Sequence, residues 1–76
     1  MTRAEIEQRE NRLARIGEQG YRAARAGLPL EKAPQEALQR SQQYARRMPG
    51  LTPQQRKDQA AEYRSWFLSW YYEEMA

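Results

Sequence analysis

The chain has 76 residues with no cysteine and no histidine, and its 13 basic and 10 acidic side chains give a net charge of +3. These absences exclude disulfides, thiolate metal sites and a histidine general base. No apolar run approaches the ~20 residues that a membrane span needs, and "MTRAEIEQRE" lacks an apolar signal segment, so we expect a soluble cytoplasmic protein without a membrane partner. The length predicts one domain, residues 1–76, which buries only about 60% of its unfolded surface.

The first predicted helix extends from Thr2 to about Gly27. Thr2 and Glu5 form the pattern of a capping box, in which each side chain satisfies a free backbone N–H of the other residue. Gly27 precedes Leu-Pro, which is typical of a helix end. Small and apolar residues share one face of this helix, namely Ile6, Leu13, Ile16, Gly20, Ala23, Ala24 and Gly27. We therefore expect this face to pack against the rest of the fold.

The second predicted helix follows the connector "LPLEKAP" and runs from about Pro34 to Arg47. Proline suits the first turn of a helix, and the "MPG" that follows cannot continue it. Its apolar positions also favour one face: Ala37, Leu38, Tyr44, Ala45 and Met48. This pattern again predicts a helix that packs on one side only.

The third predicted helix runs from about Pro53 to Glu74. Thr52 is a good N-cap, Pro53 suits the first turn, and Gln55 completes a second capping box. Strand patterns are lacking, because no segment alternates with a period of two and valine is absent. The sequence predicts an all-α fold, either a small bundle of three helices or two long helices joined by a helical connector.

The aromatic residues gather in the third helix, where "YRSWFLSWYY" holds six of the eight in the chain. Tyr63, Trp66, Phe67 and Trp70 fall within about 100° of arc, with Tyr71 at the edge. Buried rings remove roughly 150–250 Å² each from water, enough to hold a small fold, although the same rings also suit stacking on bases. The predicted core comprises Leu13, Ile16, Gly20, Tyr63, Trp66, Phe67 and Trp70.

A second apolar face of the third helix carries Leu68, Tyr72 and Met75. The first two helices have no apolar stripe left to cover it. This face is a candidate protein interface, either for a homodimer or for another protein. The alternative is a half-exposed helix end without a partner.

Arginine far outnumbers lysine among the basic residues, which suits planar contacts to phosphate but is also what a GC-rich genome encodes. The candidate RNA-contacting residues are Arg15, Arg22, Arg25, Lys32, Arg40, Arg46, Arg47 and Arg64. If the helices pack antiparallel, the basic residues of the first two helices form one surface. Contacts from four to six of them to phosphate predict a salt slope of about −3 to −5, whereas an ordinary solvated face predicts none.

Catalysis has little support in the sequence. There is no glycine-rich phosphate loop, no nucleophile system and no metal-ligand cluster, and Glu73 with Glu74 reads as a solvated acidic pair. We therefore expect a protein that is not an enzyme, with no cofactor, no bound metal and no small-molecule substrate.

Two short segments resemble the ribosome modulation factor family of small bacterial proteins. "GYRAARAG", Gly20 to Gly27, is similar to the family's first-helix motif, and "WFLSW" keeps two tryptophans four residues apart, with Ser69 where the family often has glycine. The ending "YYEEMA" is similar in kind. The matching positions, mostly structural, are Gly20, Tyr21, Ala23, Ala26, Gly27, Trp66 and Trp70. The connector is longer than in the family and holds an extra helix, and the first helix is extended.

The resemblance implies binding to the ribosome or its RNA and inhibition of translation in slow-growing cells, with ribosomes driven into inactive dimers. From charge and placement we assign the RNA contacts to Arg22, Arg25, Lys32 and Arg64 first. The sequence thus predicts a non-enzymatic ribosome- or RNA-binding regulator. The alternative is a helical protein-binding adaptor or inhibitor, of a phage or plasmid type, that uses the Leu68–Met75 face.

Overall fold

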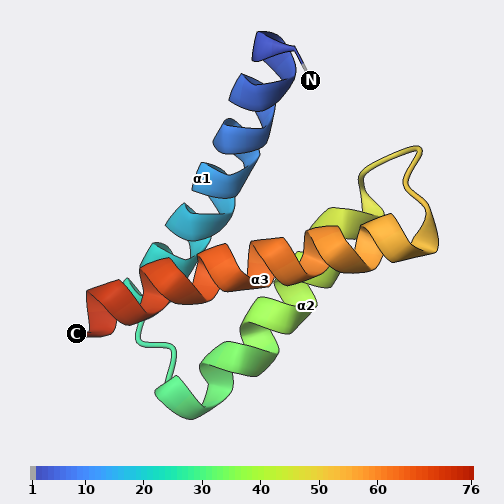
Figure 1. Ribbon diagram of the computed structural model, residues 1–76. Helices are drawn as coiled ribbons and strands as arrows, with labels where there is room; N and C mark the ends of the chain where they lie inside the picture. Colours follow the sequence, from blue (N-terminus) through green and yellow to red (C-terminus); the bar gives the residue numbers. More distant parts are fainter. Residues whose placement is uncertain (1) are drawn as a thin grey trace.

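The computed structural model describes residues 2–76 as three packed helices without strands (Figure 1). Helix α1 spans Arg3–Arg25, α2 spans Ala33–Arg46 and α3 spans Pro53–Met75, with a 3₁₀ turn, η1, at Leu30–Lys32. The all-α, three-helix prediction is therefore confirmed. None of the helices described here combines the length and the apolarity that crossing a bilayer requires.

The helix ends follow from local sequence chemistry. The hydroxyl of Thr2 accepts a hydrogen bond from the backbone N–H of Glu5 at 3.2 Å. At α3 the capping box is complete, because Thr52 accepts from the Gln55 N–H at 3.1 Å and the Gln55 side chain accepts from the Thr52 N–H at 2.9 Å. Helix α1 ends at Arg25, and Gly27 just beyond it has a φ of 92°, which glycine adopts easily and most other residues do not.

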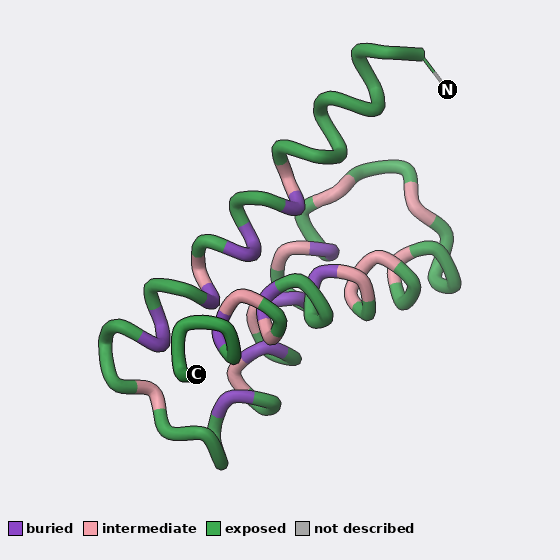
Figure 2. Tube along the Cα trace, turned by 60° about the vertical axis from the view of Figure 1, so that its left-hand side comes forward, coloured by how far each residue is buried: buried purple, intermediate pink, exposed green. Residues whose placement is uncertain are grey.

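Helix α3 is the centre of the fold, because α1 and α2 both pack against it and scarcely touch each other. Figure 1 shows α3 lying across both of the other helices. The first turns of α1 project beyond this crossing, and residues 2–11 are exposed throughout (Figure 2). Helix α3 thus holds the other two helices together.

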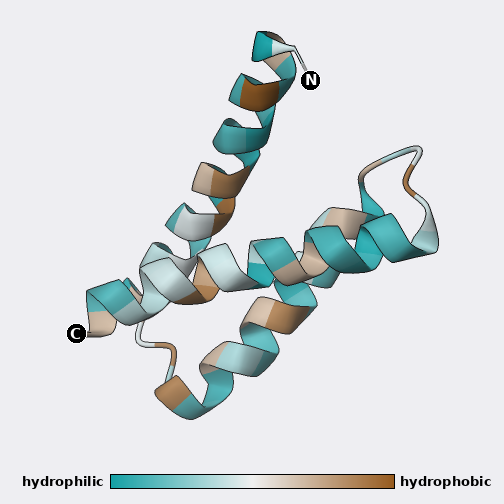
Figure 3. Ribbon diagram, viewed as in Figure 1, coloured by the Kyte–Doolittle hydropathy of each residue, from teal (hydrophilic) through white to brown (hydrophobic). Residues whose placement is uncertain are grey.

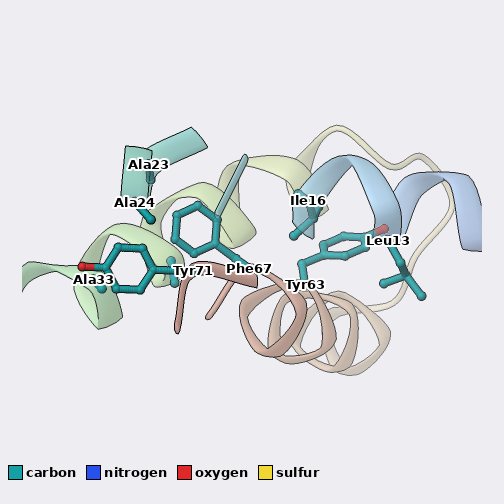
Figure 4. Packing of buried hydrophobic residues seen from close by; sticks show 9 residues of the cluster. Leu13, Ile16, Ala23, Ala24, Ala33, Tyr63, Phe67 and Tyr71 are labelled. Atoms are coloured by element: carbon teal, nitrogen blue, oxygen red, sulfur yellow. The ribbon is translucent and has the colours of Figure 1, made fainter. Parts of the chain in front are cut away.

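The core forms where the three helices meet (Figure 4). Tyr63, Phe67 and Tyr71 occur every four residues along α3 and are almost fully buried. From α1 they meet Leu13 and Ile16, with small alanines beyond. Helix α2 contributes only small buried residues, namely Ala33, Ala37, Ser41 and Ala45. The aromatic rings therefore fill the volume that α2 leaves.

Helices α1 and α3 approach most closely at Gly20. A Cβ placed on Gly20 would lie 2.0 Å from the backbone carbonyl oxygen of Phe67. Any side chain there must push the two backbones apart. A Cβ on Gly17 would instead meet the Trp70 indole at 2.5 Å, so this glycine makes room for a side chain.

The buried side of α3 differs from the predicted one. Trp66 is 39% exposed, and Trp70 is half-buried against Gly17, whereas Tyr71 is fully buried. The prediction of Trp66 as a core residue is wrong, and that of Trp70 holds only in part. The cause is that α1 and α2 both pack on the side of α3 that carries Tyr63, Phe67 and Tyr71. The centre of this buried side lies about 50° around the helix axis from the centre of the predicted one.

The two buried phenols find partners in the segments that join the helices. The Tyr71 hydroxyl donates to the backbone oxygen of Leu28, and the Tyr63 hydroxyl lies 3.3 Å from the sulfur of Met48. Burial raises the pKa of both phenols above 10.0, and for Tyr63 the nearby Arg12 opposes part of this rise. Each phenol thus ties a connecting segment to α3.

Candidate nucleic-acid interface

A groove of about 420 Å³ opens between α2 and α3, on the side away from α1. We call it the cationic groove. Its floor is largely apolar, and its lining residues are Leu38, Gln42, Ala45 and Arg46 from α2 and Pro53, Arg56, Lys57, Ala60, Ala61 and Arg64 from α3. Four of these ten side chains are cationic and none is acidic. The groove is therefore a concave, positively charged surface.

None of the four cations of the groove is neutralised by an internal ion pair within residues 2–76. Arg46, Arg56, Lys57 and Arg64 form no ion pair with any residue of the described chain, whereas five other arginines do. The surrounding sequence supports this charge, since residues 37–57 hold five basic residues and no acidic one. Cations without an internal partner keep their full capacity for phosphate or carboxylate.

Two of the four acidic residues of α3 pair with arginines of α1. Glu62 pairs with Arg9, and Glu74 lies 3.5 Å from Arg25. The last third of the chain has a net charge of −1, yet it supplies Arg56, Lys57 and Arg64 to the groove. The cations of α3 thus line the groove, whereas Glu62 and Glu74 pair with α1. The first half of α3 is mostly hydrophilic (Figure 3).

Arg56 is the most deeply set cation of the groove. One of its terminal nitrogens donates to the backbone oxygen of Met48 at 3.4 Å, which links α3 to the loop after α2. Its Nε is buried and has no hydrogen-bond partner among residues 2–76. A buried guanidinium with a free donor is costly unless an anion or water approaches. Arg56 is therefore held in place with a donor still to satisfy.

The predicted RNA-contacting residues do not all line the same surface. Arg46 and Arg64 line the cationic groove. A second, shallower face between α1 and α2 carries Arg15, Arg22, Arg40 and Arg47. On α2 the two surfaces separate at Arg46 and Arg47, because successive helix residues point about 100° apart.

Three of the predicted residues are engaged within the protein. Arg22 pairs with Glu18 and Arg40 with Glu36, both at 2.7 Å, and Arg25 pairs with Glu74. Lys32 lies in η1, away from the other basic residues that line either surface. Two of the four cations of the second face, Arg22 and Arg40, therefore have acidic partners, whereas none of the groove cations has one in the part of the chain that the structure describes.

Sequence reasoning missed two residues of the groove, Arg56 and Lys57. They stand at the start of a helix whose total charge is negative, which concealed them. The available signal was spacing, because Lys57, Ala61 and Arg64 recur at intervals of four and three residues and so share a helical face. The acid-free run of residues 37–57 was a second signal.

The residues of the predicted protein interface differ in their exposure. Tyr72 and Met75 are each 44% exposed, whereas Leu68 packs partly against the core. We call Leu68, Tyr72 and Met75 the α3 ridge. The Tyr72 ring and the Met75 thioether of this ridge are exposed to solvent, whereas Leu68 is partly buried.

The described chain offers no group of three or more acidic side chains that could hold a metal ion. Comparison with protein-family models, with curated proteins and with solved structures found no match to this chain.

Proposed function

We propose that the protein is a non-enzymatic RNA-binding regulator of the ribosome, as its resemblance to ribosome modulation factor implies, and that it binds RNA through the cationic groove. The observation that carries this proposal is the set of four cations around one concave surface, without acidic residues in the lining and without internal ion pairs. Phosphate is the anion that such a set attracts most readily, because each contact releases a counterion from RNA.

The test is co-sedimentation with ribosomes at low and high salt. Wild-type protein should pellet with ribosomes at low salt and dissociate as salt rises, because phosphate contacts are screened. The Arg46→Gln/Arg64→Gln variant should lose most of this binding. A wild-type protein that stays in the supernatant at low salt would contradict the proposal.

A matched control removes the same charge elsewhere. Arg3 and Arg22 are exposed and form i,i+4 pairs on α1, so the Arg3→Gln/Arg22→Gln variant should fold and bind like wild type. If both double variants weaken binding equally, net charge rather than the groove governs binding. The groove assignment would then fail.

The second candidate function, a protein-binding adaptor, is favoured by the exposed side chains of Tyr72 and Met75 and by the apolar groove floor. Affinity capture from lysate with and without RNase separates the two functions. Partners that leave with RNase support RNA binding, and partners that stay support the adaptor.

A further inference from the structure

We propose that the ligand of the cationic groove is an unpaired RNA strand, which continues from the groove along the α3 ridge and stacks a base on Tyr72. This inference rests on the proposed function and deepens it. It adds a stacking residue to the phosphate-binding cations, and it names the kind of RNA that the surface takes.

The ridge continues the groove along the same face of α3. Ala61 and Arg64 line the groove, and Leu68 lies one turn beyond Arg64. At 3.6 residues per turn, Leu68 and Tyr72 each lie within about 20° of Ala61 around the helix axis, and Met75 within about 40°. Leu68 and Tyr72 lie about 40° and 80° around the axis from Arg64, so a strand that leaves the groove at Arg64 winds past Leu68 to Tyr72, which is about 12 Å farther along the helix.

Tyr72 packs against a core residue and is partly exposed to solvent. Its ring packs edge to face on Tyr71 with centroids 5.4 Å apart, and Tyr71 is itself buried and bonded to Leu28. The outer part of the Tyr72 ring remains exposed. A ring positioned by the core loses little conformational freedom when a base stacks on it.

Acidic side chains do not interrupt this path on the ridge. Glu73 lies about 100° around the helix from Tyr72, and Glu74 faces Arg25. Asp58 lies about 60° from Ala61, outside the groove lining, and accepts a hydrogen bond from Gln54. The face from the groove to Tyr72 is thus cationic, then apolar, then aromatic.

The apolar floor distinguishes an unpaired strand from a duplex. A duplex presents mainly phosphates and sugar hydroxyls, and its base faces are stacked inside. An unpaired strand also presents base faces, which suit Leu38, Ala60 and Ala61 in the floor and the Tyr72 ring beyond. Alternating cations and apolar surface are typical of proteins that bind single strands.

Fluorescence anisotropy with a labelled 12-nucleotide RNA, compared with a hairpin duplex of matched length, tests the proposal. We expect the single strand to bind at least about tenfold more tightly.

Tyr72→Leu should weaken binding about tenfold without changing the salt slope, because stacking involves no counterion release. Arg64→Gln should reduce the slope by about 0.7. Tyr72→Phe keeps the ring and should bind like wild type.

Tyr21 provides the matched control, since it is 39% exposed but lies on α1, away from the groove. Tyr21→Leu should leave RNA binding unchanged, and circular dichroism shows whether each variant is folded. Equal affinity for the duplex, or equal losses in Tyr72→Leu and Tyr21→Leu, would overturn the stacking proposal. If Arg64→Gln still weakened binding in that case, the proposed function would stand.

Two further outcomes are distinct. If no RNA binds wild type at low salt, the proposed function fails together with this inference. If Tyr72→Leu instead removes an RNase-resistant protein partner, the ridge is a protein interface and the inference is wrong.

Discussion

Helix α3 meets its two neighbours in different ways. Against α1 the backbones approach closely at Gly20, large rings are buried, and ion pairs join the helices at Glu62 and Glu74. Against α2 the buried residues are small, one hydroxyl at Ser41 has no partner in the described chain, and an open groove remains. The contact with α1 buries large side chains, whereas the contact with α2 leaves an open groove lined by cations.

This difference teaches where stability and recognition reside. Glu62 and Glu74 of α3 pair with α1, whereas the cations of α3 on the α2 side form no ion pair within the described chain. A small protein with marginal stability can keep an open cationic groove only if another contact holds the fold. We therefore expect substitutions at the α1 contact to affect unfolding, and substitutions in the groove to affect binding.

The largest expected effect is from Phe67→Ala, at the centre of the α1 contact. Phe67 is fully buried, and removing a buried phenylalanine costs about 3–5 kcal/mol, enough to unfold a domain of this size. Urea denaturation followed by circular dichroism measures the loss. Trp66→Ala, at the adjacent but 39% exposed position, should cost less than half as much. Equal losses at the two positions would contradict the observed rotation of α3.

The next effect separates the two glycines of α1. Gly20→Ala places a Cβ against backbone that cannot move aside, so we expect a loss of about 1–3 kcal/mol despite alanine's better helix propensity. Gly17→Ala meets only the half-buried Trp70 ring, which can shift outward. Its loss should be smaller, and its tryptophan fluorescence should change more. A stable Gly20→Ala protein would show that the helices can separate freely.

Much of this α1 contact could be predicted from the sequence. The caps at Thr2 and Thr52 fix where α1 and α3 begin, and Leu13 with Ile16 marks the buried face of α1. The rotation of α3 could not be predicted, because Trp70 and Tyr71 lie next to each other on an almost continuously apolar segment. Which ring is buried depends on where two other helices pack, and periodicity does not contain that information.

The groove was harder to predict for a related reason. Arg46 and Arg47 are neighbours in sequence, yet only Arg46 lines the groove, since successive helix residues point about 100° apart. Arg56 and Lys57 belong to a helix of negative total charge, in which Glu62 and Glu74 pair with α1 instead. The net charge of a segment does not show on which face of the helix its cations and its acidic residues lie.

At the α2 contact the expected effect has the opposite sign. Ser41 is buried and its hydroxyl has no hydrogen-bond partner among the described residues, so Ser41→Ala should stabilise the protein by about 1 kcal/mol. Ser65→Ala, at an exposed position of α3, controls for helix propensity and should stabilise less. A destabilised Ser41→Ala protein would mean that this hydroxyl is satisfied in solution.

The smallest effect is a dependence on alkaline pH that comes from the buried phenols of Tyr63 and Tyr71. Burial raises the pKa of each phenol in the folded state above the unfolded value of 10.0. Their contribution is complete below that pH, where both states are protonated. As pH rises above about 10, the unfolded state loses its protons first, so the free energy of unfolding decreases.

Urea midpoints measured from about pH 9 to pH 11 test this dependence. Tyr63→Phe removes one phenol and should show a shallower decline than wild type over the same range. The two proteins differ only at residue 63, so the difference between the two curves isolates the Tyr63 phenol. Parallel curves would mean that the Tyr63 phenol is as accessible to water in the folded protein as in the unfolded chain. The packing of α3 between α1 and the loop after α2 would then be looser than its contact with Met48 implies.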